Sequence, residues 1–289
     1  MMRVACIGEA MIELSMNGGA AQVGVAGDTL NTAIYLKRAA PEIEVDYITR
    51  LGADPFSEQI RDFISGEEIG VSRIEMANGG TPGLYAITTD DAGERSFTYW
   101  RSDSAARKLF ADLNFSALEG YDLIYLSGIS LAILPSDVRA GLLTWITQND
   151  VQLAYDSNFR RRLWECEVEA RAVNQAYWAA THIALPSIDD EMDLFGETAQ
   201  QVNDRWRAAG CDGALKRGGL GPMGIGGQVD QDYSTVASVL DTTAAGDSFN
   251  GGFLAARLTG ASRADALRAG HDLAATVIQH RGAIIPKGA

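Results

Sequence analysis

Short apolar runs alternate with amphipathic helical patterns along almost the whole chain of 289 residues. Runs rich in Val, Ile and Leu are typical of strands buried on both faces, and intervening helices are typical of a covered parallel sheet. No repeat or linker divides the sequence, so we predict one doubly wound α/β domain over residues 1–289. The expected strands are residues 4–7, 45–49, 123–127, 152–155, 182–185 and 213–216. The expected helices are residues 29–39, 55–65, 135–148, 167–180, 188–195, 200–209, 247–258 and 262–279.

One segment, residues 81–101, breaks this rhythm and is predicted to form a β-hairpin around a polar turn at residues 90–94. Alternation places Phe97, Tyr99 and Arg101 on one face and Ser96, Thr98 and Trp100 on the other. Two interpretations stay open. The hairpin either packs against the parent domain or forms a small lid that closes over a ligand.

Charge and cysteine content narrow the function. The chain carries 38 acidic residues against 24 Lys and Arg, a net charge of −14, which argues against nucleic acid as a partner. No apolar run is long enough to cross a membrane, and the opening run ends before Glu9, too early for a signal-peptide core. Cys6, Cys166 and Cys211 form no C-x-x-C pair. We therefore expect a cytoplasmic protein with reduced thiols that binds neither membrane nor nucleic acid.

The most informative motif is Asp-Thr-Thr-Ala-Ala-Gly-Asp-Ser-Phe-Asn-Gly-Gly-Phe at residues 241–253. Small residues lead into a predicted helix whose first turn offers unpaired N–H groups and the positive end of the helix dipole. That combination binds anions, phosphates above all. Asp247 stands where it is able to accept a proton from a hydroxyl held in front of it. The alternative is that Asp247 only caps the helix.

This motif resembles the C-terminal signature of the ribokinase-like (pfkB) carbohydrate kinases. Three other family motifs precede it in the chain, in the order expected for the family. They are residues 24–33 (GVAGDTLNTA), 52–56 (GADPF) and 216–221 (KRGGLG). The resemblance implies a three-layer α/β/α domain with a small β-lid, formed by about residues 10–25 and 81–103. It also implies transfer of phosphate from Mg-ATP, with Asp247 as catalytic base. The backbone amides of Ala244, Ala245 and Gly246 would form the anion hole.

Finer details resemble the kinases of 2-keto-3-deoxygluconate within that family. They lie at residues 8–14, 93–101, 126–132, 156–164 and 281–286. A sugar acid carries a carboxylate, which Arg grips with two parallel hydrogen bonds. The resemblance implies phosphorylation of the 6-hydroxyl and a substrate site made of Gly27, Asp28, Asn31, Tyr85, Tyr99, Arg101, Arg160 and Asp247. Arg101 and Arg160 taken singly also fit solvated surface charges, and a kinase of a neutral sugar such as fructose or ribose is the nearest alternative.

For ATP, the resemblance implies contacts with Asn158, Ser187, Lys216, Gly218, Gly221, Gly246 and His280. His280 equally fits a plain residue at a helix end. Four positions depart from the family pattern: Ala26 and Ala244 replace glycines, and Ser187 and Asp190 replace the Asn and Glu that organise Mg²⁺. Asp190 is the expected magnesium residue, acting through water, and an ordinary helix-capping acid is the alternative.

Two more distant functions fit the sequence less well. A nicotinamide-dependent oxidoreductase would need G-x-G-x-x-G after the first strand, where this chain has Gly-Glu-Ala-Met at residues 8–11. A non-catalytic sugar sensor would have no need of Asp247 in an intact turn. The predicted lid is also a candidate surface for a homo-oligomer.

Overall fold

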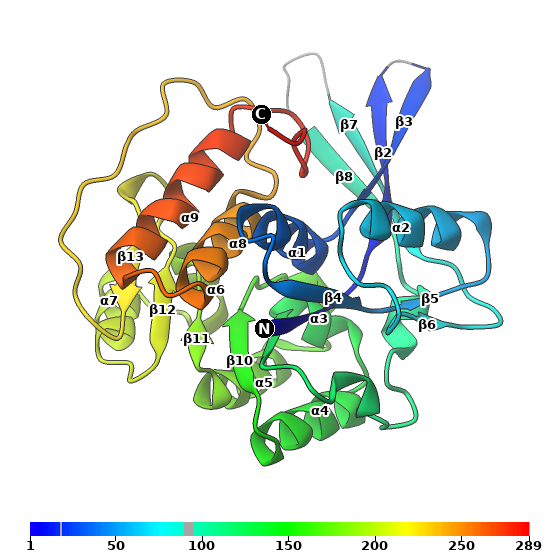
Figure 1. Ribbon diagram of the computed structural model, residues 1–289, viewed down its shortest axis with the longest axis horizontal. Helices are drawn as coiled ribbons and strands as arrows, with labels where there is room; N and C mark the ends of the chain where they lie inside the picture. Colours follow the sequence, from blue (N-terminus) through cyan, green and yellow to red (C-terminus); the bar gives the residue numbers. More distant parts are fainter. Residues whose placement is uncertain (18, 90–94, 289) are drawn as a thin grey trace.

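The computed structural model describes residues 1–17, 19–89 and 95–288, and its centre is a seven-stranded sheet (Figure 1). The strand order is β13-β12-β11-β10-β9-β1-β4, and every pairing is parallel except that of β12 with β13. The strands are β1 (Arg3–Ile7), β4 (Glu44–Ile48), β9 (Leu123–Ser127), β10 (Gln152–Asp156), β11 (Ile183–Ala184), β12 (Asp212–Leu215) and β13 (Met223–Ile225).

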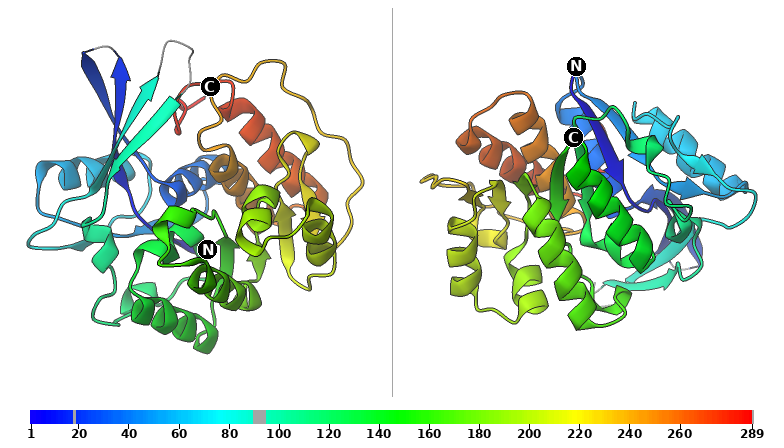
Figure 2. Two further views of the ribbon diagram at one scale, coloured as in Figure 1. Left: turned by 180° about the vertical axis from the view of Figure 1, so that it is seen from behind. Right: turned by 90° about the horizontal axis from the view of Figure 1, so that it is seen from below.

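Helices cover both faces of this sheet because its strands are apolar on both sides. In β1, Val4 and Cys6 belong to one buried cluster while Ala5 and Ile7 belong to the other. The first cluster lies under α1 (Asp28–Ala39), α2 (Pro55–Gly66), α8 (Ala245–Leu258) and α9 (Arg263–Val277). The second lies under α3 (Gly128–Ile133), α4 (Ser136–Gln148) and α5 (Glu167–Ala180), seen from behind in Figure 2. Helices α6 (Ile188–Phe195) and α7 (Ala199–Arg207) pack beside β11 to β13. The three-layer prediction is confirmed.

The predicted elements all appear, each boundary within two residues of its expected place. The pattern did not reveal α3, which has only six residues and starts at Gly128, or β13, which has three. A two-stranded pair, β5 (Arg50–Leu51) with β6 (Glu75–Met76), was also not expected. The turn expected at residues 90–94 lies outside the described residues. None of the helices in the described part of the chain is both long and apolar enough to cross a lipid bilayer.

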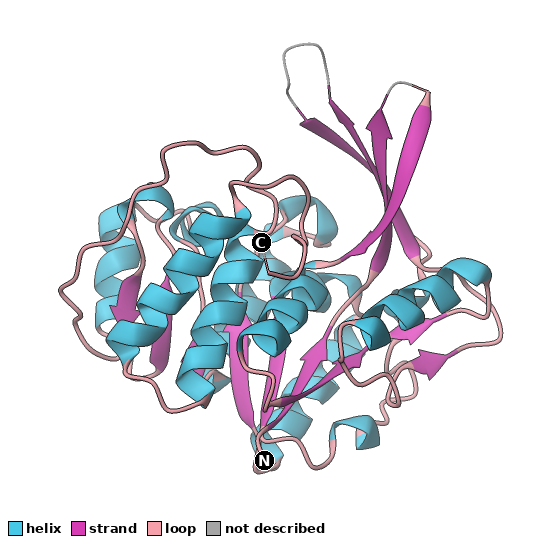
Figure 3. Ribbon diagram, turned by 45° about the horizontal axis from the view of Figure 1, so that its top comes forward, coloured by secondary structure: helices cyan, strands magenta, loops and turns pink. Residues whose placement is uncertain are grey.

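A second sheet stands away from the main body (Figure 3). It has the order β3-β2-β7-β8 and consists of β2 (Met11–Asn17), β3 (Ala20–Ala26), β7 (Gly83–Thr89) and β8 (Arg95–Trp100). The hairpin predicted at residues 81–101 therefore pairs with a hairpin near the N-terminus through parallel β2 and β7. One face packs Met11, Ala26, Tyr85 and Ile87 against Ala283, with Ala244 at the rim of this cluster. We call this four-stranded unit the lid sheet.

Candidate active site

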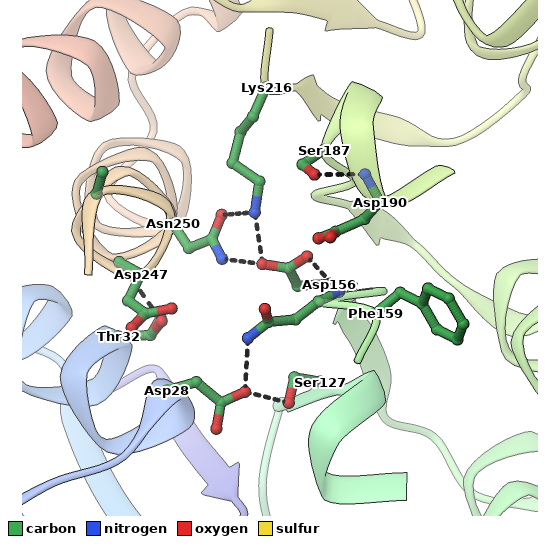
Figure 4. Close-up of polar contacts among 12 residues, drawn as sticks. Asp28, Thr32, Ser127, Asp156, Phe159, Ser187, Asp190, Lys216, Asp247 and Asn250 are labelled. Atoms are coloured by element: carbon green, nitrogen blue, oxygen red, sulfur yellow. Dashed lines mark hydrogen bonds and ion pairs between the residues drawn. The ribbon is translucent and has the colours of Figure 1, made fainter. Parts of the chain in front are cut away.

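The carboxyl ends of β9, β10 and β12 meet the N-terminal ends of α1 and α8 at one edge of the central sheet (Figure 4). Ligands of open parallel sheets bind at this edge, because loops and helix N-termini converge there. The sequence places polar residues at these strand ends, directly after apolar runs. Asp156 ends β10 and Lys216 follows β12.

Helix α8 begins with a turn suited to an anion. Ala244, its N-cap, has the left-handed backbone angle φ of 60°. The Ala245 N–H donates to Thr242 O at 3.2 Å, and the Ser248 N–H donates to Ala244 O at 2.8 Å. Between them, the N–H groups of Gly246 and Asp247 lie in the first turn, where no preceding helical turn supplies carbonyls. Two amides and the helix dipole therefore favour negative charge at this point.

Asp247 is held by α1 from two sides. The Asn31 Nδ2 donates to Asp247 Oδ2 at 2.8 Å, and the Thr32 hydroxyl donates to Asp247 O at 3.2 Å. The helices lie this close because residue 251 is glycine, where a β-carbon would be 2.6 Å from Cβ of Tyr35. Burial, and then the negative charge of Asp28, raise the pKa of the Asp247 carboxyl well above the ordinary value. A carboxylate of raised pKa is a stronger proton acceptor when it is ionised.

Asp28, at the start of α1, is the second carboxylate of the site. It accepts hydrogen bonds from Ser127 Oγ at 2.5 Å and Asn158 Nδ2 at 2.9 Å. The residue before it lies very close to the segment after β1, since a β-carbon at Gly27 would lie 2.2 Å from Glu9 O. Position 27 therefore has no room for a side chain, and glycine is required there.

Lys216, directly after β12, pairs with a third carboxylate of the site, that of Asp156. Its Nζ lies 2.5 Å from Asp156 Oδ2 and 3.1 Å from Asn250 Oδ1. The Asn250 Nδ2 donates to the same Asp156 oxygen at 2.7 Å, and the Asn158 N–H donates to Asp156 Oδ1 at 3.0 Å. Figure 4 shows this network reaching from Asp28 through Asp156 to Lys216 and Asn250.

The two arginines predicted to hold a carboxylate each have an acidic partner. Arg101 pairs with Glu9, and both side chains are nearly fully buried. Arg160 Nη1 lies 3.2 Å from Asp190 Oδ1, and its side chain is 45% exposed. Burial raises the pKa of Asp190 despite this pairing with Arg160. Among the described residues the two guanidinium groups share no partner.

The inner face of the lid sheet carries the predicted tyrosines. The rings of Tyr85 and Tyr99 stack with centroids 5.5 Å apart, and the Tyr85 hydroxyl donates to Glu13. Arg162, from the loop after β10, lies over the Tyr99 ring at 4.4 Å and so links the lid sheet to the main domain.

Comparison with known proteins decides the family. The profile described as pfkB family carbohydrate kinase matches residues 1–288. The chain belongs to the pfkB family of carbohydrate kinases. It is therefore a phosphotransferase with an alcohol group as acceptor.

Two curated relatives of this pfkB kinase are each named 2-dehydro-3-deoxygluconokinase. The protein from Escherichia coli (strain K12) is 42% identical and aligns over 99% of this chain and 98% of its own length. The protein from Dickeya dadantii (strain 3937) is 43% identical, over 98% and 96%. Among solved structures, a sugar kinase from Pyrococcus horikoshii in complex with ATP has a TM-score of 0.80. It is 23% identical, over 97% of this chain and 93% of its own, so it supports the fold alone.

The remaining residues expected at the nucleotide of the pfkB kinase lie farther along the same edge. Ser187 caps α6 by accepting from the Asp190 N–H at 3.1 Å. Gly218 and Gly221 have positive φ angles of 55° and 72° at the two ends of a short 3₁₀ turn. His280 Nδ1 lies 3.0 Å from Thr276 O at the end of α9. In the described part of the chain, no hydrogen bond joins His280, Gly218 or Gly221 to the Asp247 network.

Sequence reasoning missed several members of the pfkB kinase site. Glu9, Glu13, Asp156, Asn250 and Arg162 were not assigned roles, although each lies in or beside a recognised motif. The signal for Glu9 was available, because an acid between Gly8 and an apolar strand must find a cationic partner when buried. That Arg101 is this partner depends on sheet pairing, which the pattern alone does not give.

Proposed function

We propose that the chain is an ATP-dependent kinase of 2-keto-3-deoxygluconate, also called 2-dehydro-3-deoxygluconate. The product would be the 6-phosphate, as in sugar-acid breakdown of the Entner–Doudoroff type. The carrying observation is the convergence of Asp247, the open first turn of α8 and Asp28 at one edge of the sheet. The names of relatives at 42% and 43% identity support the choice of acceptor.

The acceptor would lie between the lid sheet and the N-termini of α1 and α8. Its 6-hydroxyl would face Asp247, while Asp28, Asn31 and the backbone at Gly27 hold the other hydroxyls. Tyr85 and Tyr99 would cover it from the lid sheet, and Arg101 and Arg160 would meet its carboxylate. For this, Arg160 exchanges Asp190 for the acid, a small rearrangement for a side chain that is 45% exposed.

ATP would place its terminal phosphate at the Gly246 and Asp247 amides, with Asn158, Ser187, Lys216, Gly218, Gly221 and His280 along its length. Membership of the pfkB carbohydrate kinase family supports this choice of nucleotide. Asp247 would take the proton of the acceptor hydroxyl while the anion hole stabilises the charge on the phosphoryl oxygens.

Magnesium fits the same edge through water. The Asp190 side chain is 20% exposed, and its carboxylate forms a salt bridge with Arg160. The described residues offer no group of three His, Cys, Asp or Glu that would form a complete protein cage. Mg²⁺ usually keeps several waters and takes one or two carboxylates together with substrate phosphates. We infer that Asp190 would hold a water of Mg²⁺, which when bound offsets phosphate charge.

A neutral sugar such as fructose or ribose is the second candidate acceptor. The observation in its favour is that Arg101 and Arg160 are already paired with Glu9 and Asp190. Guanidinium groups balanced in this way add less net positive charge to the site than two free arginines would.

A coupled assay of ADP release over a panel of acceptors tests the proposal. We expect kcat/KM for 2-keto-3-deoxygluconate to exceed that for fructose and ribose, which lack the carboxylate, by about 100-fold, the worth of one bidentate carboxylate contact. A preference for fructose or ribose would refute the acceptor while leaving the kinase assignment in place.

We propose that the enzyme works in the cytoplasm, because ATP is available there and the free thiols of Cys6, Cys166 and Cys211 would stay reduced.

We also propose that the protein forms a homo-oligomer through the outer face of the lid sheet, where Trp100, Val23 and Met16 are 57%, 44% and 37% exposed. Light scattering of the wild type against Trp100→Thr tests this, and a wild-type monomer at micromolar concentration would refute it.

A further inference from the structure

Lys216 reaches the place where the anion-binding turn meets the carboxylate network. It follows β12, and its side chain is only 12% exposed. A β-carbon at Gly246 would lie 3.7 Å from the Lys216 Nζ. The ammonium group therefore lies against the first turn of α8, next to the N–H groups proposed to receive the terminal phosphate. Figure 4 shows the side chain pointing from β12 toward Asn250 and Asp156.

The hydrogen bonds of Lys216 leave one donor available. An ammonium group has three N–H donors. Among the described residues, Lys216 Nζ has two acceptors, Asp156 Oδ2 and Asn250 Oδ1. By contrast, the neighbouring Arg217 donates from Nε to Gly221 O at 3.0 Å.

Asp156 does not need Lys216 alone for its hydrogen bonds. Its Oδ2 also accepts from Asn250 Nδ2, and its Oδ1 accepts from the Asn158 N–H. Asn250 is fixed in turn by donating to the Tyr125 hydroxyl at 3.1 Å. Asp156 and Asn250 thus hold the ammonium group from one side, which fixes the direction of its third N–H. A buried lysine held like this is preorganised for an anion.

We propose that Lys216 is a catalytic residue that binds the transferring phosphoryl group through this third donor. The inference deepens the proposed kinase function and rests on it. In the step, the acceptor oxygen forms a bond to the γ-phosphorus while the bond from that phosphorus to the β,γ-bridging oxygen breaks. The electron pair of the broken bond leaves with ADP, and the acceptor proton goes to the Asp247 carboxylate. Lys216 stabilises the charge on the phosphoryl oxygens, and Asp156 and Asn250 are its positioning residues.

The test replaces Lys216 by Met and uses Lys108→Met as the matched control, because the Lys108 side chain is 61% exposed and pairs with the exposed Asp103. We expect Lys216→Met to lower kcat by roughly 10²–10³-fold, the usual worth of one preorganised charge-stabilising group. The acceptor KM should change by less than about threefold, and the control should keep wild-type rates. Unchanged kcat in folded Lys216→Met would overturn the proposal.

Nucleotide binding gives a readout that is independent of turnover. Measured by calorimetry, Lys216→Met should raise the Kd for β,γ-imido-ATP by about tenfold and the Kd for ADP by less than threefold. The reason is that only β,γ-imido-ATP carries the terminal phosphate that Lys216 is proposed to contact. Equal losses for both nucleotides would overturn the assignment to the terminal phosphate. This comparison needs no acceptor, so it stays valid even where the wild type prefers a neutral sugar.

A double variant separates this role from a structural one. Lys216→Met alone leaves Asp156 buried without its cation, which lowers stability. Adding Asp156→Asn removes that charge and should restore the melting temperature while kcat stays low. Recovery of kcat together with stability in the double variant would show that Lys216 only neutralises Asp156, and would overturn the proposal.

Discussion

The two sheets of this kinase have the same hydrogen-bonding chemistry but very different surroundings. In the central sheet, β1 is buried on both faces, with Val4, Ala5, Cys6 and Ile7 at 0% exposure. In the lid sheet, one face packs against residues near α8 and the other exposes Trp100, Val23 and Met16. The proposed reacting groups, Asp247 and Lys216, belong to the first sheet and its helices, and Tyr85 and Tyr99 belong to the second. In the proposed mechanism the buried central sheet and its helices carry the chemistry, and the lid sheet, with its exposed outer face, is the element that would open for the acceptor.

The largest expected effect tests the central sheet and its helices. Asp247→Asn should lower kcat by roughly 10²–10⁴-fold, the usual worth of a positioned base, and should leave ATP binding nearly intact. Asp150→Asn, an exposed aspartate, is the control. Steady-state and binding measurements on both variants decide. Near-normal turnover in folded Asp247→Asn protein would remove this carboxylate from the reaction.

The next effect falls on the boundary between the two sheets. Arg160→Met keeps much of the apolar stem but removes the guanidinium, so kcat/KM for the sugar acid should fall by about 30–150-fold. The KM for ATP should hardly change. Arg161→Met is a close control, because Arg161 is 53% exposed and pairs with Glu167 and Asp193. Equal losses for charged and neutral acceptors would contradict the carboxylate role.

A third prediction concerns how the free energy of unfolding depends on pH through Asp247. Because the pKa of Asp247 is raised on folding, this group contributes most below the pKa of the unfolded chain, and that contribution is lost as pH rises. Asp247→Asn should therefore match the wild type near pH 4 and exceed its unfolding free energy by about 1–2 kcal/mol at neutral pH. Urea titrations at both pH values measure the difference. A less stable variant at neutral pH would show that Asp247 is held in the folded state as a favourable charge.

The smallest effect tests the lid sheet itself. If it closes over the acceptor, amide hydrogen exchange in β7 should slow by about threefold to tenfold with saturating 2-keto-3-deoxygluconate, while β1 and β9 change little. Exchange followed by mass spectrometry resolves these strands. Unchanged exchange in β7 at saturation would favour the simpler alternative, in which the hairpin only packs against its neighbours.

Periodicity predicted the central sheet well because its strands are continuous apolar runs and its helices have clear polar faces. It also placed Asp247 at a helix start, since small residues lead into it. Strand β3 was harder, because its sequence, Ala-Ala-Gln-Val-Gly-Val-Ala, contains small residues on both faces. The pairing of Glu9 with Arg101, and of Asp156 with Lys216 and Asn250, could not be predicted. Such contacts join residues 60 to 94 positions apart, and they exist only once the strand order is known.

The order of strands in the lid sheet also has a consequence for how the chain folds. Strand β2 pairs in parallel with β7, and the partners Glu13 and Tyr85 are 72 positions apart. During synthesis the hairpin of β2 and β3 therefore emerges long before β7 exists. A two-stranded hairpin is marginal in water by itself, and closing so long a loop carries an entropy cost. The segment between them contains α1, β4 and α2. Most of its buried apolar side chains share one core cluster with Val4 and Cys6 of β1. The lid sheet is thus completed late, and until β7 arrives the apolar side chains of β2 have no sheet partner beyond β3.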